Sequence, residues 1–276
     1  MEQVLKTMLE NVRAKSPLVH NITNYVTVND VANVLLAAGG SPIMSDDADD
    51  VEDITSICGG LNINIGTLNK NPIPSMFLAG KKANALGHIV LLDPVGAGAS
   101  RLRTDTANRL MREVRFDAVR GNISEIKTLC TGSGSTKGVD ADAVDAVTEA
   151  NLDDGVALVK TFAKQTGCII AVTGAIDLVS DGERCWCIRN GRAEMSRITG
   201  TGCQLSALMT AFLVANPDHK LEAAAAAVCM MGLAGEIGWA NMQPGDGNST
   251  YRNRIIDAIF NMTGDTLEEG AKYELR

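Results

Sequence analysis

The feature that most constrains the fold is a regular alternation of short apolar runs with longer segments of helical periodicity. The apolar runs have strand length and are bounded by Gly, Pro, Asn or Asp; they cover residues 40–44, 61–65, 88–92, 118–120 and 168–172. Helical patterns lie between them, over residues 29–38, 50–58, 75–86, 104–114, 124–130 and 154–165. This alternation predicts an α/β fold in which a mostly parallel central sheet has helices on both faces.

The pattern changes after residue 172. The pairs Asp181-Gly182 and Asn190-Gly191 are typical of hairpin turns, so we expect an antiparallel edge of the sheet here. From Gly202 onward the chain is predicted to be mainly helical, with a buried helix over residues 221–239, and residues 131–140 are predicted to be a connection. We find no internal repeat and no linker, and expect one domain over residues 1–276.

Charge and cysteine content exclude several classes of protein. The net charge is -8 and no basic cluster is present, which argues against nucleic acid as a partner. We expect no membrane span and no signal peptide, because no apolar run reaches the length of a span and the first residues lack a basic start. The seven cysteines are odd in number and scattered through apolar stretches, which predicts reduced thiols in a cytoplasmic protein.

A glycine turn, Gly200-Thr201-Gly202-Cys203, precedes a long helical pattern. Glycine lets the backbone approach an anion closely, and the start of a helix offers free N–H groups and a positive dipole end. The turn is therefore a candidate site for the charge that develops on a transferring phosphoryl group. A plain glycine turn before a helix is the alternative.

Polar residues follow several predicted strands, at the edge where open parallel sheets bind ligands. Asp93 begins a glycine-rich loop and is a candidate for a metal or phosphate region, or else a turn residue. Asn122 and Glu125 form a capping-box pattern and could also help to hold hydrated Mg²⁺. Thr173 could contact a nucleotide, or be a turn residue.

Near the N-terminus, residues 19–26 mix polar and apolar side chains, which suggests a binding loop. Met44 ends a predicted strand and would suit an apolar heteroaromatic ligand, although it could equally be core. His20 is interpreted as a structural histidine rather than a catalytic one. No Walker P-loop and no G-x-S-x-G elbow is present, and Gly96-Ala97-Gly98 lacks the spacing of a dinucleotide fingerprint.

Taken together, these segments resemble the hydroxyethylthiazole kinases, a thiamine-salvage branch of the ribokinase-like group, over residues 16–263. The most specific pieces are His20-Asn21-Ile22-Thr23-Asn24, Ser41-Pro42-Ile43-Met44, Asp93-Pro94-Val95-Gly96-Ala97-Gly98, Arg120-Gly121-Asn122-Ile123-Ser124-Glu125-Ile126 and Gly200-Thr201-Gly202-Cys203. The resemblance implies a ribokinase-like three-layer sandwich and ATP- and Mg²⁺-dependent phosphorylation of 4-methyl-5-(2-hydroxyethyl)thiazole. It also implies a homotrimer with active sites at subunit interfaces.

The resemblance also assigns roles to matching positions. It implies that thiazole is bound by Met44, Gly200 and Asn24, ATP by Arg120 and Thr173, and the metal-phosphate region by Asp93 and Glu125. Cys203 would take the catalytic position, supported by Gly202 and Gly200. The wider group usually has Asp there, so Cys203 favours the thiazole branch over hydroxymethylpyrimidine or pyridoxal kinases and over NAD(P)H-hydrate dehydratases, which remain the alternatives. We expect the helix start to lower the pKa of the Cys203 thiol.

Overall fold

The computed structural model describes residues 3–132 and 146–276. Within them, strands form one sheet in the order β2-β1-β3-β4-β5-β6-β7-β8-β9. Neighbouring strands are parallel from β2 to β6 and antiparallel from β6 to β9. The strands are β1 (Leu18–Ile22), β2 (Ser41–Met44), β3 (Gly60–Asn64), β4 (Ile89–Asp93), β5 (Ala118–Asn122), β6 (Ile169–Thr173), β7 (Asp177–Ser180), β8 (Cys185–Ile188) and β9 (Tyr273–Leu275).

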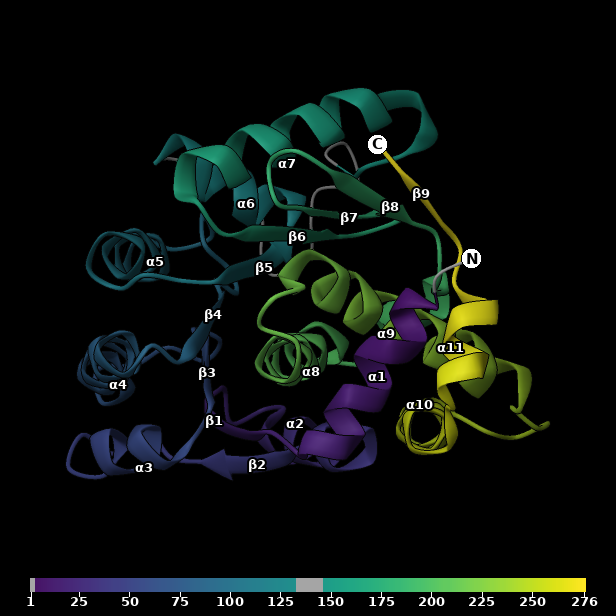
Figure 1. The fold of residues 1–276 in the computed structure, drawn as a ribbon, viewed down its shortest axis with the longest axis horizontal. Coiled ribbons are helices and arrows are strands. Elements are labelled where there is room, and N and C mark those ends of the chain that lie inside the picture. The colour runs from purple at the N-terminus through teal and green to yellow at the C-terminus, as the bar shows by residue number, and fades with distance from the viewer. Residues whose placement is uncertain (1–2, 133–145) are drawn as a thin grey trace.

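Helices cover both faces of this sheet (Figure 1). One layer consists of α3 (Val51–Ile57), α4 (Pro72–Leu86), α5 (Arg101–Glu113), α6 (Ile123–Thr131) and α7 (Leu152–Thr166). The other consists of α1 (Val4–Lys15), α2 (Val28–Ala38), α8 (Thr201–Ala215), α9 (Lys220–Ala240), α10 (Asn248–Asn261) and α11 (Gly264–Gly270). A separate apolar core fills each side of the sheet, which confirms the predicted three-layer α/β sandwich.

The predicted strands and helices between residues 29 and 172 are all present, with ends shifted by a few residues. The turn at Asp181-Gly182 joins β7 to β8 as expected. Asn190-Gly191 is not a hairpin turn, because β8 pairs next with β9 from the far end of the chain. A short 3₁₀ helix, Ala193–Arg197, follows instead. Of the predicted connection over residues 131–140, residues 133–140 lie outside the described part of the chain.

The strand β1 was not predicted, because its polar residues suggested a loop. His20 is buried within β1, where Nδ1 lies 3.0 Å from Thr55 Oγ1 and Nε2 lies 2.9 Å from the Ser45 carbonyl. Burial lowers the pKa of His20, despite the hydrogen bond to the Ser45 carbonyl and the charge of Asp50. A buried histidine with both ring nitrogens engaged confirms the structural interpretation of His20.

The prediction that no segment is long and apolar enough to span a membrane was wrong. Among the described helices, α9 is long and apolar enough to span a membrane by length and composition. Most of α9 is nevertheless buried inside the protein, where it packs against α8 and α10. The alanine run at residues 223–227 is fully buried, and small side chains let the neighbouring elements approach closely. The helix therefore has the surroundings of a core helix.

Candidate active site

The polar candidates gather at the carboxyl ends of the parallel strands. Asn64 at the end of β3 pairs in register with Asp93 at the end of β4, and Asn122 at the end of β5 pairs with Thr173 at the end of β6. The N-terminus of α8 meets this edge, since Ser206 in its second turn donates a hydrogen bond to Asp93. The structure therefore brings the glycine turn and the strand-end residues together, as the sequence predicted.

Asp93 is fully buried and holds the centre of the site. Its Oδ2 accepts hydrogen bonds from Asn64 Nδ2 at 2.8 Å, from Ser206 Oγ at 2.8 Å and from Arg120 Nη1 at 3.4 Å. Within the described residues its Oδ1 has no hydrogen-bond partner. Burial raises the pKa of Asp93, although the charge of Arg120 and the hydrogen bonds oppose that rise. The second oxygen is thus available to a ligand.

Glu125 is buried in the first turn of α6 and accepts hydrogen bonds from two backbone N–H groups. The N–H of Asn122 donates to Oε2 at 2.8 Å and the N–H of Gly96 donates to Oε1 at 2.7 Å. The Glu125 N–H donates in turn to Asn122 Oδ1, which completes the predicted capping box. Burial, with the charge of Asp93 adding to it, raises the pKa of Glu125 to about 7. Glu125 therefore ties the loop after β4 to the start of α6.

Arg120 and Thr173, the predicted ATP contacts, lie side by side. Arg120 Nη2 donates to Thr173 Oγ1 at 2.6 Å, while Nη1 is turned toward Asp93. The guanidinium lies against Gly202, where a Cβ would come within 2.5 Å of Nη2. A glycine is required at this position because any side chain would collide with the cation. The positive charge of Arg120 thus sits directly at the turn that opens α8.

Gly200 precedes α8 with φ of 87°, in the left-handed region that favours glycine. A Cβ at this position would lie 2.2 Å from Thr27 Cγ2. By helix geometry, the N–H groups of Thr201, Gly202 and Cys203 have no partner within the helix, so they can serve an anion. The anion-binding prediction for the turn is therefore consistent with its conformation.

Cys203 lies in the first turn of α8 with 9% of its surface exposed. Its Sγ accepts a hydrogen bond from Asn24 Nδ2 at 3.2 Å. The expectation that the helix start lowers the thiol pKa was wrong. Burial and the charge of Asp93 raise the pKa of Cys203, and Arg120 and the side-chain amides of Asn64 and Asn24 offset only part of that rise.

The predicted thiazole contacts reach the same place from β1 and β2. Asn24 is buried in the loop after β1, and its Oδ1 accepts from Thr27 N and Thr27 Oγ1. Met44 is half-buried at the end of β2 and packs against an apolar cluster that includes Cys203. The amide of Asn24 thus contacts the sulfur of Cys203, and the thioether of Met44 packs against the apolar cluster that includes Cys203.

Two residues of the site, Asn64 and Ser206, were not predicted from the sequence. Asn64 ends a buried strand in register with Asp93, and a polar residue closing an apolar run was the available signal. Ser206 lies one helical turn after Gly202, which places it on the same side of α8. Both donate to the same oxygen of Asp93, so they fix the orientation of that carboxylate.

The site has the oxygen donors that Mg²⁺ prefers. In the described part of the chain, no three His, Cys, Asp or Glu side chains gather into a complete metal cage. Mg²⁺ usually takes one or two carboxylates and completes its shell with water and substrate phosphate. The free Oδ1 of Asp93, with the carboxylate of Glu125 close enough to affect it electrostatically, fits such an ion.

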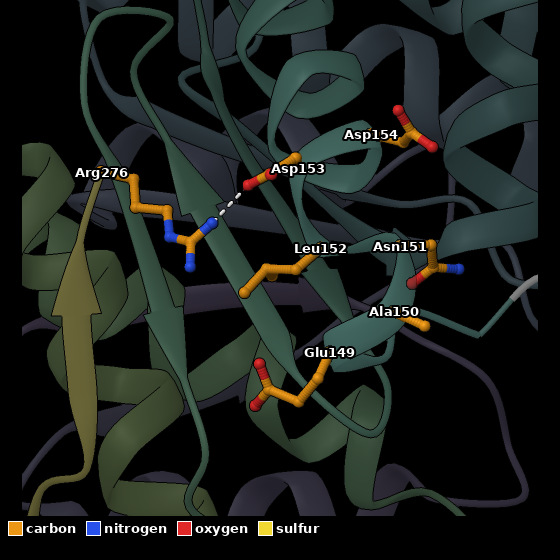
Figure 2. Close-up of a pocket in the computed structure, with 7 residues that line it drawn as sticks. All are labelled: Glu149, Ala150, Asn151, Leu152, Asp153, Asp154 and Arg276. Carbon is orange, nitrogen blue, oxygen red and sulfur yellow. Dashed lines mark hydrogen bonds and ion pairs between the residues drawn. The ribbon is translucent and has the colours of Figure 1, made fainter.

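A surface pocket of about 310 Å³ lies elsewhere, beside β9 and the start of α7 (Figure 2). It is lined by Glu149, Ala150, Asn151, Leu152, Asp153, Asp154 and Arg276. Figure 2 shows Arg276 turned toward Asp153, with which it pairs, and Arg276 also pairs with Glu274. These ion pairs join the end of the chain to α7, so the pocket's charges serve a structural contact.

Comparison with known proteins identifies this arrangement. The model of the hydroxyethylthiazole kinase family matches residues 9–265. A hydroxyethylthiazole kinase of Clostridium acetobutylicum is 58% identical over 98% of this chain and 99% of its own, and one of Ruminiclostridium cellulolyticum is 48% identical over 96% and 95%. The solved hydroxyethylthiazole kinase of Pyrococcus horikoshii superposes with a TM-score of 0.87 at 32% identity, covering 99% and 98% of the two chains. A Staphylococcus aureus pyridoxal kinase, at 16% identity and a TM-score of 0.61 over 94% and 97% of the two chains, shares the fold.

Proposed function

The chain belongs to the hydroxyethylthiazole kinase family, and from this membership we propose the reaction and the roles of its residues. The protein transfers the γ-phosphate of ATP to the hydroxyl of 4-methyl-5-(2-hydroxyethyl)thiazole, which gives the thiazole phosphate used in thiamine salvage. The observation that carries the proposal is the meeting of Cys203, Arg120 and Asp93 at the glycine turn. The proton of the attacking hydroxyl, the γ-phosphate and a metal ion could all be held close together at this turn.

The protein's own groups act on both reactants. Arg120 and Thr173 bind the nucleotide, and the turn from Gly200 to Gly202 presents N–H groups to the phosphoryl oxygens. The substrate oxygen bonds to the γ-phosphorus as the bond to ADP breaks, and Cys203 receives the hydroxyl proton. Phosphoryl transfer depends mainly on positioning and electrostatics, so a thiolate that forms only as a minor species is sufficient.

Asp93 and Glu125 would hold Mg²⁺, through the unpartnered Oδ1 of Asp93 and the carboxylate of Glu125. Bound Mg²⁺ supplies neutralisation of phosphate charge. Met44, Gly200 and Asn24 form the thiazole side of the site. The apolar cluster that includes Met44 and Cys203 supports this assignment, because a heteroaromatic ring needs apolar contact beside the reacting hydroxyl.

The test is direct. ATP, Mg²⁺ and the thiazole alcohol are mixed with the protein, and the phosphate ester is measured. Parallel reactions with hydroxymethylpyrimidine and pyridoxal separate the thiazole branch from its relatives. Product from either of these alcohols and none from the thiazole would overturn the substrate but keep the kinase. ATP binding without turnover of any alcohol would favour a hydro-lyase relative.

We also propose a homotrimer with active sites at the subunit interfaces. The loop between β1 and α2 supplies Asn24 to the site, yet the next two side chains, Tyr25 and Val26, are 74% and 54% exposed. They follow β1, which pairs with the edge strand β2, and all four residues of β2 are half-buried. Apolar side chains on a site-forming loop at a sheet edge are suited to contact with a second subunit.

Sedimentation tests the trimer. The native protein is expected at three times its 29.1 kDa chain mass. Tyr25→Asp with Val26→Asp should shift it to smaller species and reduce turnover. A monomeric native protein with full activity would contradict the assembly.

We further propose that residues 1–276 form one domain and that the protein is cytoplasmic. The seven free cysteines of the chain support the cytoplasmic location, because a reducing compartment keeps thiols unpaired.

A further inference from the structure

Two amide side chains connect the carboxylate of Asp93 to the sulfur of Cys203. Asn64 Nδ2 donates to Asp93 Oδ2 at 2.8 Å. Asn24 Nδ2 donates both to Asn64 Oδ1, at 3.1 Å, and to Cys203 Sγ, at 3.2 Å. Asn64 and Asn24 are both buried, with 1% and 5% of their surfaces exposed. The connection therefore runs through the interior, where water cannot replace a lost partner.

Backbone donors fix which way each amide faces. An N–H group can only donate, so the Asn64 atom facing the Gly66 N–H, 2.9 Å away, must be the oxygen. The Asn24 atom facing the Thr27 N–H, 3.2 Å away, must be oxygen for the same reason. The NH₂ groups of both amides are consequently directed to Asp93 and toward Cys203. The sulfur is placed as an acceptor, which is the role of a thiolate.

We propose that Asn64 is a positioning residue that sets the orientation of the Cys203 sulfur and of the Asp93 carboxylate at the same time. Its oxygen holds the Asn24 amide on Cys203, and its NH₂ group holds Asp93 Oδ2 so that Oδ1 stays free. One side chain thus couples the predicted base to the predicted metal-phosphate region. This inference rests on the proposed function of Cys203 and Asp93.

The chain contains a matched control. Asn62 lies two residues earlier on the same strand, is fully buried, and donates to Asn21 Oδ1 at 3.0 Å. In the described part of the chain, this side-chain hydrogen bond reaches neither Asp93 nor Cys203. Asn62→Leu and Asn64→Leu each remove one buried amide from β3, so they should lower the melting temperature comparably. Only Asn64→Leu removes the connection.

The first measurement is the rate of alkylation of Cys203 by iodoacetamide at neutral pH, followed by mass spectrometry of the Cys203 peptide. It needs neither ATP nor an alcohol. Asn64→Leu should slow it about tenfold, the effect of losing one hydrogen bond to a charged group, while Asn62→Leu leaves it near the native rate. Adding Asn24→Ala to Asn64→Leu should slow it little further, because both act through one connection.

The second measurement is steady-state kinetics with the thiazole alcohol. Asn64→Leu should lower kcat by about tenfold to a hundredfold with little change in KM for ATP. Asn64→Asp keeps the oxygen that faces Gly66 and Asn24 but turns a carboxylate toward Asp93. Because the charge of Asp93 already raises the pKa of Cys203, a second carboxyl there should keep both the alkylation rate and kcat low, and Asn64→Asp also serves if Asn64→Leu fails to fold.

Equal alkylation rates in the Asn62 and Asn64 variants, or additive effects of Asn24→Ala and Asn64→Leu, would overturn the inference. If the proposed kinase function is wrong, the two measurements give a different combination of results. A native protein that phosphorylates no alcohol, but whose Cys203 alkylation responds to Asn64 as expected, would remove the chemistry and leave the positioning intact.

Discussion

A buried thiol stands at residue 203, the position proposed to accept the substrate's proton. Burial and the charge of Asp93 raise the pKa of Cys203, so at neutral pH the proton stays mostly on sulfur. Arg120 and the two amides oppose this without reversing it. The sulfur is therefore a base only late in the reaction, when the hydroxyl has begun to bond to phosphorus and has become more acidic. Most of the rate must then come from the charges and N–H groups around it.

Removing the sulfur tests how much of the rate depends on Cys203 and how much on the charges and N–H groups around it. Cys203→Ala should lower kcat by about tenfold to a hundredfold, the lower part of the range for a general base, and should raise KM less. Steady-state kinetics with the thiazole alcohol gives both constants. Native kcat in the variant would show that Cys203 takes no part in proton transfer.

Asp93 should matter more than Cys203, because its free Oδ1 is assigned to the metal-phosphate region. Asp93→Asn keeps the shape but removes the charge, so turnover should fall at least about a hundredfold and should respond weakly to added Mg²⁺. Asp117→Asn is the control. That carboxylate lies at the opposite end of β5, where it accepts from the Val90 N–H and pairs with Lys220. Native Mg²⁺ dependence in Asp93→Asn would contradict its assigned role.

At the scale of elements, the N-terminus of α8 organises the site. Gly200 sets the turn, Gly202 admits the Arg120 guanidinium, and Ser206 reaches Asp93. The helix is apolar around its whole circumference and is buried along nearly all of its length. Its end cannot move without disturbing the core, so the N–H groups of the turn are held rigidly toward the strand ends.

Gly200→Ala should disturb this element from its first residue. The left-handed φ of 87° strains any side chain, and the new Cβ would collide with Thr27, which holds Asn24. We expect a loss of about 1–3 kcal/mol in the free energy of unfolding and a fall in kcat.

Gly247→Ala is the control for this substitution. It begins α10 with φ of -127° and has no atom within 4 Å of its added Cβ. Chemical denaturation should therefore show a near-native free energy of unfolding for Gly247→Ala. Equal stabilities of the two variants would contradict the strain argument.

At the scale of the whole molecule, the sheet gathers buried acids at one edge. Burial is the largest cause of the raised pKa of Asp93, Glu125 and Asp177, and the pKa of each of the last two is raised to about 7. A carboxyl with a raised folded pKa binds its proton more tightly when folded than when unfolded. The folded protein is therefore destabilised as pH rises toward neutrality.

The shifted pKa of Glu125 defines the pH range over which this stability is lost. Its stabilising contribution is full below its ordinary pKa of 4.5 and is lost as pH rises to about 7. The total is about 3 kcal/mol for a shift of this size. In metal-free protein, Glu125→Gln should remove this part of the pH dependence. Glutamine keeps one acceptor oxygen and replaces the other with an NH₂ group that cannot accept from a backbone N–H, which adds an offset that does not vary with pH.

Urea unfolding in EDTA, near pH 5 and near pH 8, measures the effect. The native protein should lose more stability between these values than Glu125→Gln does. Added Mg²⁺ should restore stability to the native protein at the higher pH, because it binds the ionised carboxylates. Parallel pH profiles of the two proteins would contradict a raised pKa at Glu125.

The sequence alone determined the layered fold, because strand and helix periods are local and each is set by which residues must be buried. It also placed Asp93, Asn122 and Thr173 at strand ends, and parallel pairing brings such ends to one edge. The family's motifs then indicated Cys203 and the kinase reaction. These conclusions needed no knowledge of which side chains touch.

Only the tertiary structure decided the contacts and their electrostatics. The strand β1 was not predicted, because its polar His20 and Asn21 find partners that are remote in sequence, Thr55 and Asn62. The pKa of Cys203 rises rather than falls, chiefly because of burial and then the charge of Asp93. The proposed role of Asn64 likewise depends on its contacts with Asp93 and Asn24, which form only in the folded protein. Desolvation and hydrogen bonding depend on neighbours that residue order does not reveal, and here they set the surroundings of the Cys203 sulfur.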